Sequence, residues 1–191
     1  MQSSLDTINR SIKAHIDTIT SIRYLTKEIE ALASKLLDTL KKGGTIYWCG
    51  NGGSAADCQH LAAELVGRFN KERPPLKSIA LTTDTSAITC ISNDYSFDEI
   101  FSRQVQGLCT SNDFLIGIST SGNSLNVFKA FETAIRLGVS CAGLLGKDGG
   151  MVRGLPIDSI TISSNETARV QEAHILIGHI LCDIIDNSID F

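Results

Sequence analysis

The sequence predicts an α/β fold, a three-layer sandwich in which a five-stranded parallel sheet lies between helices, with additional helices at the N-terminus. Short apolar runs alternate along the chain with longer segments whose apolar residues recur at helical spacing. This alternation is typical of parallel sheets with right-handed crossovers. The run "DFLIGIS" (113–119) is apolar almost throughout, which indicates a strand covered on both faces. We find no internal repeat, linker or low-complexity segment, and therefore expect one domain over residues 1–191.

The first 42 residues are polar, with isoleucine and leucine at spacings of three and four. The members of this pattern are Ile12, Ile16, Ile19, Ile22, Ile29, Leu32, Leu36 and Leu40. We predict two amphipathic helices that end at Gly43 and Gly44. Their apolar stripes are longer than one small sheet face can cover, and exposed patches of that size are typical of interfaces. We therefore expect residues 1–42 to be oligomerisation helices and residues 43–191 to form the α/β core.

The first half of the core contains two predicted strands. The run "TIYWCG" (45–50) is a short buried strand. A helix follows in "SAADCQHLAAELVGRF" (54–69), where Ser54 can act as the N-cap. The second strand is "KSIALT" (77–82), and residues 84–110 are expected to form short helices.

The second half of the core continues the alternation. After the third strand, residues 124–138 are predicted to form a helix that ends in a glycine. The fourth and fifth strands are expected at 139–146 and 158–163. A long helix is predicted from Glu166 to Ile189.

Composition limits the class of function. Hydrophobic residues make up 42% of the chain and the formal net charge is −4, which argues against a disordered or a nucleic-acid-binding protein. The six cysteines form no CxxC pair, which favours reduced thiols in a cytoplasmic protein over a disulfide framework. The N-terminal stretch has no long apolar segment, and no run of 18 apolar residues occurs. We therefore expect neither a signal peptide nor a membrane span.

Three polar loops are associated with the predicted strands. The loop "GNGGS" follows the first strand, "SND" (92–94) lies between the second and third, and "GISTSGNS" (117–124) ends the third. Ligands of parallel α/β sheets bind at the carboxyl ends of the strands, so we expect these loops to converge. The third loop is uncharged, rich in hydroxyls and followed by a helix, and it can bind a phosphate through hydroxyl and N–H groups. An ordinary N-capped turn is the alternative.

The glycines of the first loop have the form of a dinucleotide-binding fingerprint. Gly50, Gly52 and Ala55 match its spacing. The fingerprint requires an acidic residue about 20 positions further on, and Asp84 lies well beyond that distance. A glycine-rich turn that approaches a smaller ligand explains the same residues, and we do not expect a nicotinamide cofactor.

His60 and Glu64 are four residues apart and share one face of the predicted helix. Such a pair can bind a metal or act as an acid and a base. A surface pair on an amphipathic helix is the alternative. The neighbouring side chains are apolar or small, namely Leu61, Ala62, Ala63, Leu65 and Val66. We therefore expect the helix to be buried on most sides, where a charged Glu64 needs a partner.

The last predicted helix contributes Gln171, His174 and His179. At about 100° per residue, His174 lies about 60° to one side of Gln171 and His179 about 80° to the other. His179 has isoleucine and leucine neighbours, so it is either a core histidine or a site residue. Spacing alone does not rank His174 against His179.

Several spaced motifs together resemble the phosphoheptose isomerases, members of the sugar isomerase (SIS) family. The motifs are "CGNGGSAADCQHLAAELVGR", "ISND", "GISTSGNS", "GKDGG" and "ARVQEAHILIGHIL". The resemblance extends from about residue 45 to the end, and the N-terminal helices fit it. It implies a single SIS domain with a five-stranded parallel sheet, a homotetramer, and one zinc ion per subunit. It also implies isomerisation of D-sedoheptulose 7-phosphate to D-glycero-D-manno-heptose 7-phosphate, for the heptose of the lipopolysaccharide core.

The resemblance also implies roles for individual residues. The phosphate would be held by Ser119, Thr120, Ser121 and Ser124. The sugar would be bound by Asn51, Gly52, Gly53, Asn93 and Asp94, with Glu64 and Gln171 also touching the substrate. The zinc ligands would be His60, Glu64, Gln171 and His179. Glu64 and His179 would be the acid–base pair. The chain departs from some members in having Ala168 where they carry an acid, so any role of that acid is in doubt here.

A regulatory function is the main alternative. The DiaA-type proteins of the same family are tetramers that bind the replication initiator and have no enzymatic activity, and "LCDIIDNSI" resembles their tail. Those regulators lack the equivalents of Glu64 and His179. Burying a carboxylate and an imidazole costs free energy that a binding module has no need to spend, so we favour the enzyme. Isomerases of other pentose or hexose phosphates are a third reading. We expect no nucleic-acid partner.

Overall fold

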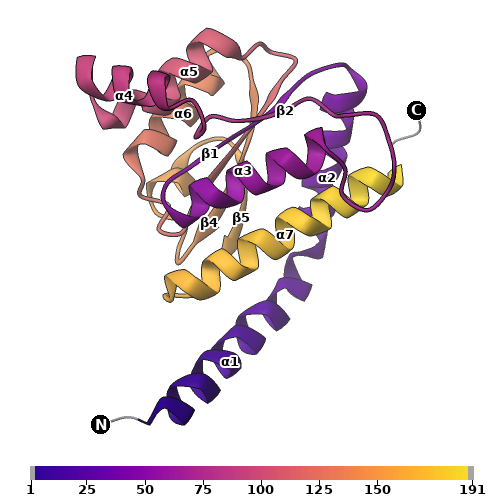
Figure 1. The fold of residues 1–191 in the computed structure, drawn as a ribbon, viewed down its shortest axis with the longest axis vertical. Helices are drawn as coiled ribbons and strands as arrows, with labels where there is room; N and C mark the ends of the chain where they lie inside the picture. Colours follow the sequence, from indigo (N-terminus) through magenta and orange to yellow (C-terminus); the bar gives the residue numbers. More distant parts are fainter. Residues whose placement is uncertain (1–2, 189–191) are drawn as a thin grey trace.

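The structure is a computed structural model that describes residues 3–188, and a five-stranded sheet forms its centre (Figure 1). The strand order is β2-β1-β3-β4-β5, and every neighbouring pair is parallel. The strands are β1 (Ile46–Gly50), β2 (Ser78–Ala80), β3 (Phe114–Ser119), β4 (Ser140–Gly146) and β5 (Asp158–Ile162). The five strands that the sequence predicts are thus confirmed.

Helices cover both faces of the sheet, as the three-layer prediction requires. One layer contains α2 (Thr26–Lys41), α3 (Gly53–Val66) and α7 (Thr167–Ser188), and the other contains α5 (Ile100–Leu108) and α6 (Leu125–Arg136). Alternate residues of one strand enter different cores. Trp48 packs with the α3 and α7 side, whereas Tyr47 packs with the α5 and α6 side. Because both faces are covered, the strands are apolar without alternation.

The connections between strands are short helices and turns. Between β2 and β3 the chain forms α4 (Thr85–Asp94), the 3-10 turn η2 (Phe97–Glu99) and then α5, which confirms the short helices predicted there. A further 3-10 turn, η3 (Met151–Gly154), follows β4. The predicted end of the last helix, Ile189, lies outside the described residues. No helix in the described part of the chain is long and apolar enough to cross a membrane.

The start of α3 differs from the sequence prediction. The N-cap is Gly52, with a φ of +56° and no side-chain hydrogen bond, so the expectation that Ser54 caps this helix is wrong. Ser54 lies inside the first turn and is buried. A glycine suits the cap because a positive φ is strained for residues with a Cβ atom.

The order of the strands reverses between β1 and β3. The chain passes from β1 outward to β2 and then returns to the other side of β1. Gly50 at the end of β1 pairs with Ile118 near the end of β3, so the loops that follow these two strands are neighbours. Ligands of open α/β sheets bind at such a reversal. The convergence predicted for these two loops is therefore confirmed. The third expected loop, "SND" (92–94), is instead the last turn of α4.

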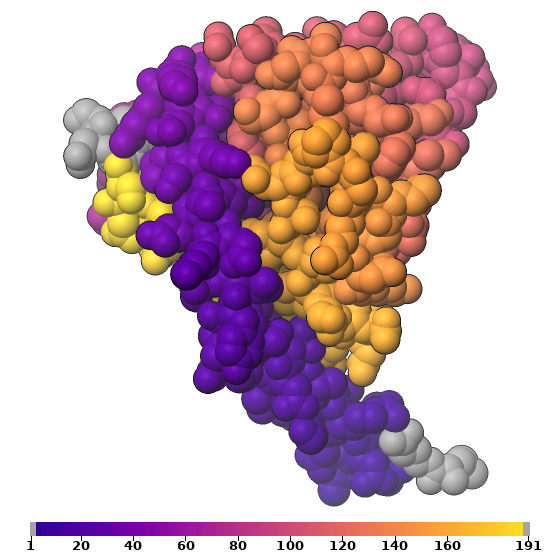
Figure 2. Space-filling model, turned by 180° about the vertical axis from the view of Figure 1, so that it is seen from behind, coloured from indigo at the N-terminus to yellow at the C-terminus, as the bar shows by residue number. Residues whose placement is uncertain are grey.

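The N-terminal segment extends away from the body of the molecule. It consists of α1 (Ser4–Ser21) and the 3-10 turn η1 (Ile22–Leu25), which leads into α2. Figures 1 and 2 show α1 projecting beyond the sheet, and this helix has no buried residue. Large apolar side chains on α1 are more than half exposed, namely Leu5, Ile8, Ile12 and Ile16. One contact with α7 is a pair between His15 Nδ1 and Glu172 Oε2 at 2.7 Å.

Candidate active site at the carboxyl ends of the strands

The serine-rich loop after β3 has the geometry of an anion site. Ser119 Oγ lies 3.0 Å from Ser124 Oγ and accepts a hydrogen bond from the N–H of Gly122 at 3.1 Å. Ser124 is the N-cap residue of α6, but its side chain makes no capping bond. Ser124 therefore satisfies none of the first N–H groups of α6 with its side chain; Val127 donates to Asn126 Oδ1, and an anion can accept from the N–H groups before it.

The loop "GKDGG" (146–150) packs against this serine loop. Gly122 has a φ of +65°, and a Cβ atom there would lie 1.9 Å from the carbonyl oxygen of Gly149. Met151 donates its N–H to Asn123 Oδ1 at 2.9 Å. The two loops are thus in direct backbone contact, which holds the serine hydroxyls in place.

The glycine loop after β1 lies against α7. A Cβ atom on Gly53 would meet Gln171 Nε2 at 2.3 Å, so the glutamine side chain packs directly on the backbone of this loop. Asn51 is half-buried in the same loop. The structure therefore brings Gln171 to the residues that the resemblance assigns to the sugar.

His60, Glu64 and His179 form a cluster between α3 and α7. Glu64 Oε1 lies 2.9 Å from His60 Nε2, and His60 Nε2 lies 3.2 Å from His179 Nε2. One ligand atom from each residue lies within 4.8 Å of the others. The side chain of His60 is 48% exposed and that of Glu64 is 25% exposed, so solvent and substrate can reach them. The expectation that α3 is buried on most sides is wrong, because its buried residues occupy one face.

The donor set fits a zinc ion. Zinc in proteins binds imidazole nitrogen and carboxylate oxygen in a tetrahedral arrangement, with ligand atoms about 3.3 Å apart. The separations within the cluster are close to this value. Two imidazole nitrogens that face each other at 3.2 Å cannot both carry a hydrogen, so at least one lone pair points into the space between them.

The other predicted ligand on α7 lies apart from this cluster. Gln171 is eight residues before His179, which corresponds to about 12 Å along the helix axis. Its side chain is at Gly53, as described above. The structure thus brings three of the four predicted ligands together within one chain and leaves Gln171 at the glycine loop after β1.

The structure ranks the two histidines of α7. His174 is fully buried and pairs through Nε2 with the carbonyl oxygen of Leu145 at 3.0 Å. Burial lowers the pKa of its imidazole to about 4, so it stays neutral at pH 7. His174 is therefore a core histidine, and His179 is the one that joins the cluster.

Asn93 and Asp94 lie at the end of α4 and are exposed. Asn93 Nδ2 donates to Asp94 Oδ1 at 2.8 Å. Their placement at the surface leaves both side chains accessible to a ligand.

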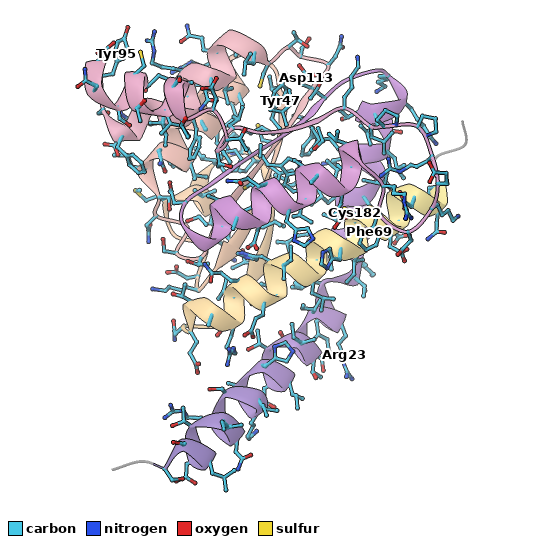
Figure 3. All side chains as sticks on the ribbon, viewed as in Figure 1. Arg23, Tyr47, Phe69, Tyr95, Asp113 and Cys182 are labelled. Carbon is cyan, nitrogen blue, oxygen red and sulfur yellow. The ribbon has the colours of Figure 1, made fainter. Side chains whose placement is uncertain are left out.

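Two neighbours of the cluster were missed by sequence reasoning. The ring of Phe69 stacks on His179 with centroids 5.5 Å apart, and Figure 3 shows Phe69 against α7. Asp57 lies one turn before His60, and its Oδ2 atom is buried without a hydrogen-bond partner among the described residues. Burial raises the pKa of the Asp57 carboxyl, and the nearby His60 and His179 partly oppose this shift. Only the three-residue spacing to His60 could have pointed to Asp57.

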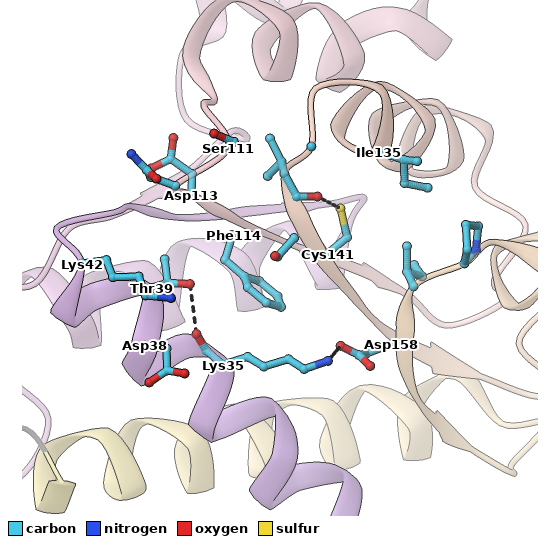
Figure 4. Close-up of a pocket in the computed structure, with 16 residues that line it drawn as sticks. Lys35, Asp38, Thr39, Lys42, Ser111, Asp113, Phe114, Ile135, Cys141 and Asp158 are labelled. Carbon is cyan, nitrogen blue, oxygen red and sulfur yellow. Dashed lines mark hydrogen bonds and ion pairs between the residues drawn. The ribbon is translucent and has the colours of Figure 1, made fainter.

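A large pocket lies elsewhere and holds none of the predicted site residues. Figure 4 shows it between α2 and the residues at the amino ends of β3, β4 and β5, with an ion pair between Lys35 and Asp158 at its edge. Parallel α/β sheets bind ligands at the opposite ends of their strands. This pocket is therefore not the candidate active site.

Comparisons with known proteins agree with this architecture. A sequence model of the SIS domain family matches residues 9–146. The phosphoheptose isomerase of Aliarcobacter butzleri (strain RM4018) is 51% identical, over 95% of this chain and 97% of that protein. Two solved structures align with 97% of this chain over 100% of their own chains. They are GmhA of Neisseria gonorrhoeae (40% identity, TM-score 0.92) and a phosphoheptose isomerase of Francisella tularensis (38% identity, TM-score 0.93). The chain therefore belongs to the SIS domain family and, within it, to the phosphoheptose isomerases.

Proposed function

We propose that this protein isomerises D-sedoheptulose 7-phosphate to D-glycero-D-manno-heptose 7-phosphate, in the cytoplasm, as a step towards the heptose of lipopolysaccharide. The observation that carries the proposal is the cluster of Glu64, His60 and His179 on α3 and α7, the same two helices that bring Gln171 to the glycine loop after β1. The relatives described above are named for this activity, which does not favour the regulator reading.

Glu64 and His179 supply the proton transfers. Isomerisation moves a proton between C1 and C2 through an enediolate, and it needs a base for the carbon proton and an acid for the oxygens. Glu64 takes the proton from carbon, and His179 transfers protons to and from the oxygens on C1 and C2. His60 bonds to Glu64 at 2.9 Å and limits its rotamers. The predicted cofactor is one zinc ion per subunit on this cluster, where it would stabilise negative charge on the substrate oxygens.

Residues of the loops after β1 and β3 and of α3, α4 and α7 hold the substrate. The phosphate is bound by the hydroxyl and N–H groups of Ser119, Thr120, Ser121 and Ser124. The sugar is bound by Asn51, Gly52, Gly53, Asn93, Asp94, Gln171 and Glu64. Gln171 is the predicted fourth metal ligand as well, and to act so it must leave Gly53 or come from a second copy of the chain.

The decisive experiment is incubation of the zinc-loaded protein with sedoheptulose 7-phosphate, followed by detection of the aldose. We expect catalytic formation of the heptose 7-phosphate. Absence of product, together with binding of a replication initiator protein, would favour the DiaA-type reading. Turnover of a pentose or hexose phosphate in place of the heptulose would favour another isomerase of the family.

Ser121→Ala is expected to raise KM more than it lowers kcat. The phosphate on C7 is remote from C1 and C2. Removing one hydroxyl that contacts it therefore weakens the binding of the substrate and of the transition state by similar amounts. Initial rates over a range of substrate concentrations separate the two constants. A large fall in kcat at unchanged KM would contradict the assignment of this loop to the phosphate.

Gly53→Ala is expected to lower kcat/KM by about tenfold or more without a large change in thermal stability. The new methyl group collides with the end of the Gln171 side chain, which can swing away, so the glutamine is displaced while the fold survives. The matched control is Gly107→Ala, because a Cβ atom there meets nothing within 4 Å. Equal activity of the two variants would show that Gln171 is not used at this place.

The α1 stripe is expected to pack between subunits of a homotetramer. It is continuous with an apolar groove between the N-terminal helices and α7, whose apolar lining is Ile19, Ile22, Ile29, Leu176, Ile180 and Ile184. Replacing both Ile8 and Ile12 by glutamate should reduce the molecular mass seen by light scattering at micromolar concentration. Thr7→Glu, about 140° around the helix from Ile12, is the control. An unaltered chain that is monomeric at that concentration would refute the tetramer.

A further inference from the structure

Asn126 is a buried polar residue that contacts the glycine loop after β1. It lies in the first turn of α6, it is 2% exposed, and the proposed mechanism gives it no role. Its side chain forms two hydrogen bonds with the side chain of Asn51. Asn51 Nδ2 donates to Asn126 Oδ1 at 2.8 Å, and Asn126 Nδ2 donates to Asn51 Oδ1, also at 2.8 Å.

A third hydrogen bond decides how both amides are oriented. The backbone N–H of Val127 donates to Asn126 Oδ1 at 2.9 Å. A backbone N–H can only donate, so the atom of Asn126 that faces it must be the oxygen. The nitrogen of Asn126 then faces Asn51, and because an amide NH2 group only donates, it must meet the oxygen of Asn51. One backbone group therefore determines which way the Asn51 amide points.

We infer that Asn126 is a positioning residue for Asn51 and sets which hydrogen-bonding groups Asn51 presents to the sugar. Asn51 retains one N–H and one oxygen lone pair beyond those used by Asn126, and their places are set by the paired amides. This inference rests on the proposed role of Asn51 in sugar binding.

The same pair joins the two halves of the substrate site. Asn51 belongs to the loop after β1, whereas Asn126 belongs to the helix whose N-terminus meets the serine loop. The two hydrogen bonds therefore set the position of the glycine loop after β1 relative to the serine loop after β3. A substrate that contacts both loops binds more tightly when their positions are already fixed, because no free energy is lost in ordering either loop.

Asn126→Asp tests the inference with little change in shape. The aspartate keeps an oxygen for the Val127 N–H and for the donor of Asn51. Its second oxygen replaces the NH2 group, so with the carboxylate ionised an oxygen faces an oxygen whichever way the Asn51 amide turns. A buried acceptor without a donor costs about 1–3 kcal/mol, which corresponds to about a 5- to 150-fold effect. We expect kcat/KM to fall by at least about tenfold.

A double-mutant cycle distinguishes positioning from a structural role. Asn51→Ala, Asn126→Asp and the double variant are compared with the unaltered protein. If Asn126 acts through Asn51, Asn126→Asp lowers kcat/KM less than about twofold further once Asn51 is alanine. If the two losses multiply, Asn126 acts on the fold instead and the inference is overturned. Asn112→Asp makes the same change of charge at an exposed residue just before β3, at the amino ends of the strands, and should have no effect.

Binding is measured on the same four proteins by calorimetry. The dissociation constant for sedoheptulose 7-phosphate should follow the same cycle, whereas that for inorganic phosphate, which reaches only the serine loop, should stay constant. A parallel loss of phosphate binding would overturn the inference, because it would mean that the serine loop itself had moved. An unaltered protein that binds the sugar phosphate without isomerising it would refute the proposed function and leave the binding cycle to test Asn126.

Discussion

Replacing Glu64 by glutamine is expected to lower kcat by at least about a hundredfold while the fold and the assembly survive. General acid–base catalysis typically contributes about 10²–10⁴-fold, and glutamine removes the basicity of Glu64 while keeping its shape. The side chain is partly exposed and bonded to His60, so the substitution neither opens a cavity nor leaves a buried charge. The loss should therefore appear in turnover and not in thermal stability.

The control for this variant is Glu72→Gln, which makes the same chemical change on a side chain that is 92% exposed. Zinc content is measured on both variants, because loss of a ligand and loss of a base would each lower activity. A zinc-loaded Glu64→Gln protein that retains most of its turnover would show that Glu64 is not the base.

The fold was predictable because its physical signal is local. Each strand is buried on both faces, so its run of apolar residues is visible in the sequence without knowledge of its neighbours. The convergence of the first and third loops followed from the parallel topology alone. The N-cap of α3 was not predictable in this way, because the positive φ of Gly52 depends on how the loop leaves the sheet.

The arrangement of the candidate site depends on how α3 and α7 pack together. A Cβ atom on Gly178 would lie 2.5 Å from Leu61 Cδ1, so the two helices are in close contact one residue before His179. This contact sets the register that places His179 at His60. His174 is buried and faces the carbonyl oxygen of Leu145. Helical spacing reports neither contact, which is why the sequence left the two histidines unranked.

A buried ion pair near the site was also invisible in the sequence, because its partners are far apart in the chain. Arg73 Nε lies 2.6 Å from Asp186 Oδ1, and both side chains are almost fully buried. Arg73 also donates to the backbone carbonyls of Glu64 and Leu65. The pair therefore attaches the loop after α3, which carries Phe69, to the end of α7.

Asp186→Ala is accordingly expected to lower the free energy of unfolding by about 3–5 kcal/mol at pH 7, since it leaves the Arg73 guanidinium buried and unpaired. Asp183→Ala, an exposed aspartate one turn earlier, is the control. Urea denaturation at one protein concentration measures both variants, because the stability of an oligomer depends on concentration. A loss of less than about 1 kcal/mol in Asp186→Ala would contradict the prediction.

The loss caused by Asp186→Ala should also depend on pH. Burial alone would raise the pKa of the Asp186 carboxyl, but hydrogen bonds from Arg73 and from the N–H groups of Lys71 and Asn70 outweigh it and hold the pKa below its ordinary value of 3.8. The unfolded chain therefore takes up a proton at a higher pH than the folded one. The contribution of Asp186 to stability is complete well above pH 3.8, begins to fall as the pH approaches 3.8, and is lost as the pH falls through the lower folded value. The difference in unfolding free energy between the unaltered protein and Asp186→Ala should thus be constant from pH 7 to about pH 5 and shrink on further acidification. A difference that stays the same down to the acid unfolding of both proteins would show that the charge of Asp186 does not contribute to the stability of this end of α7.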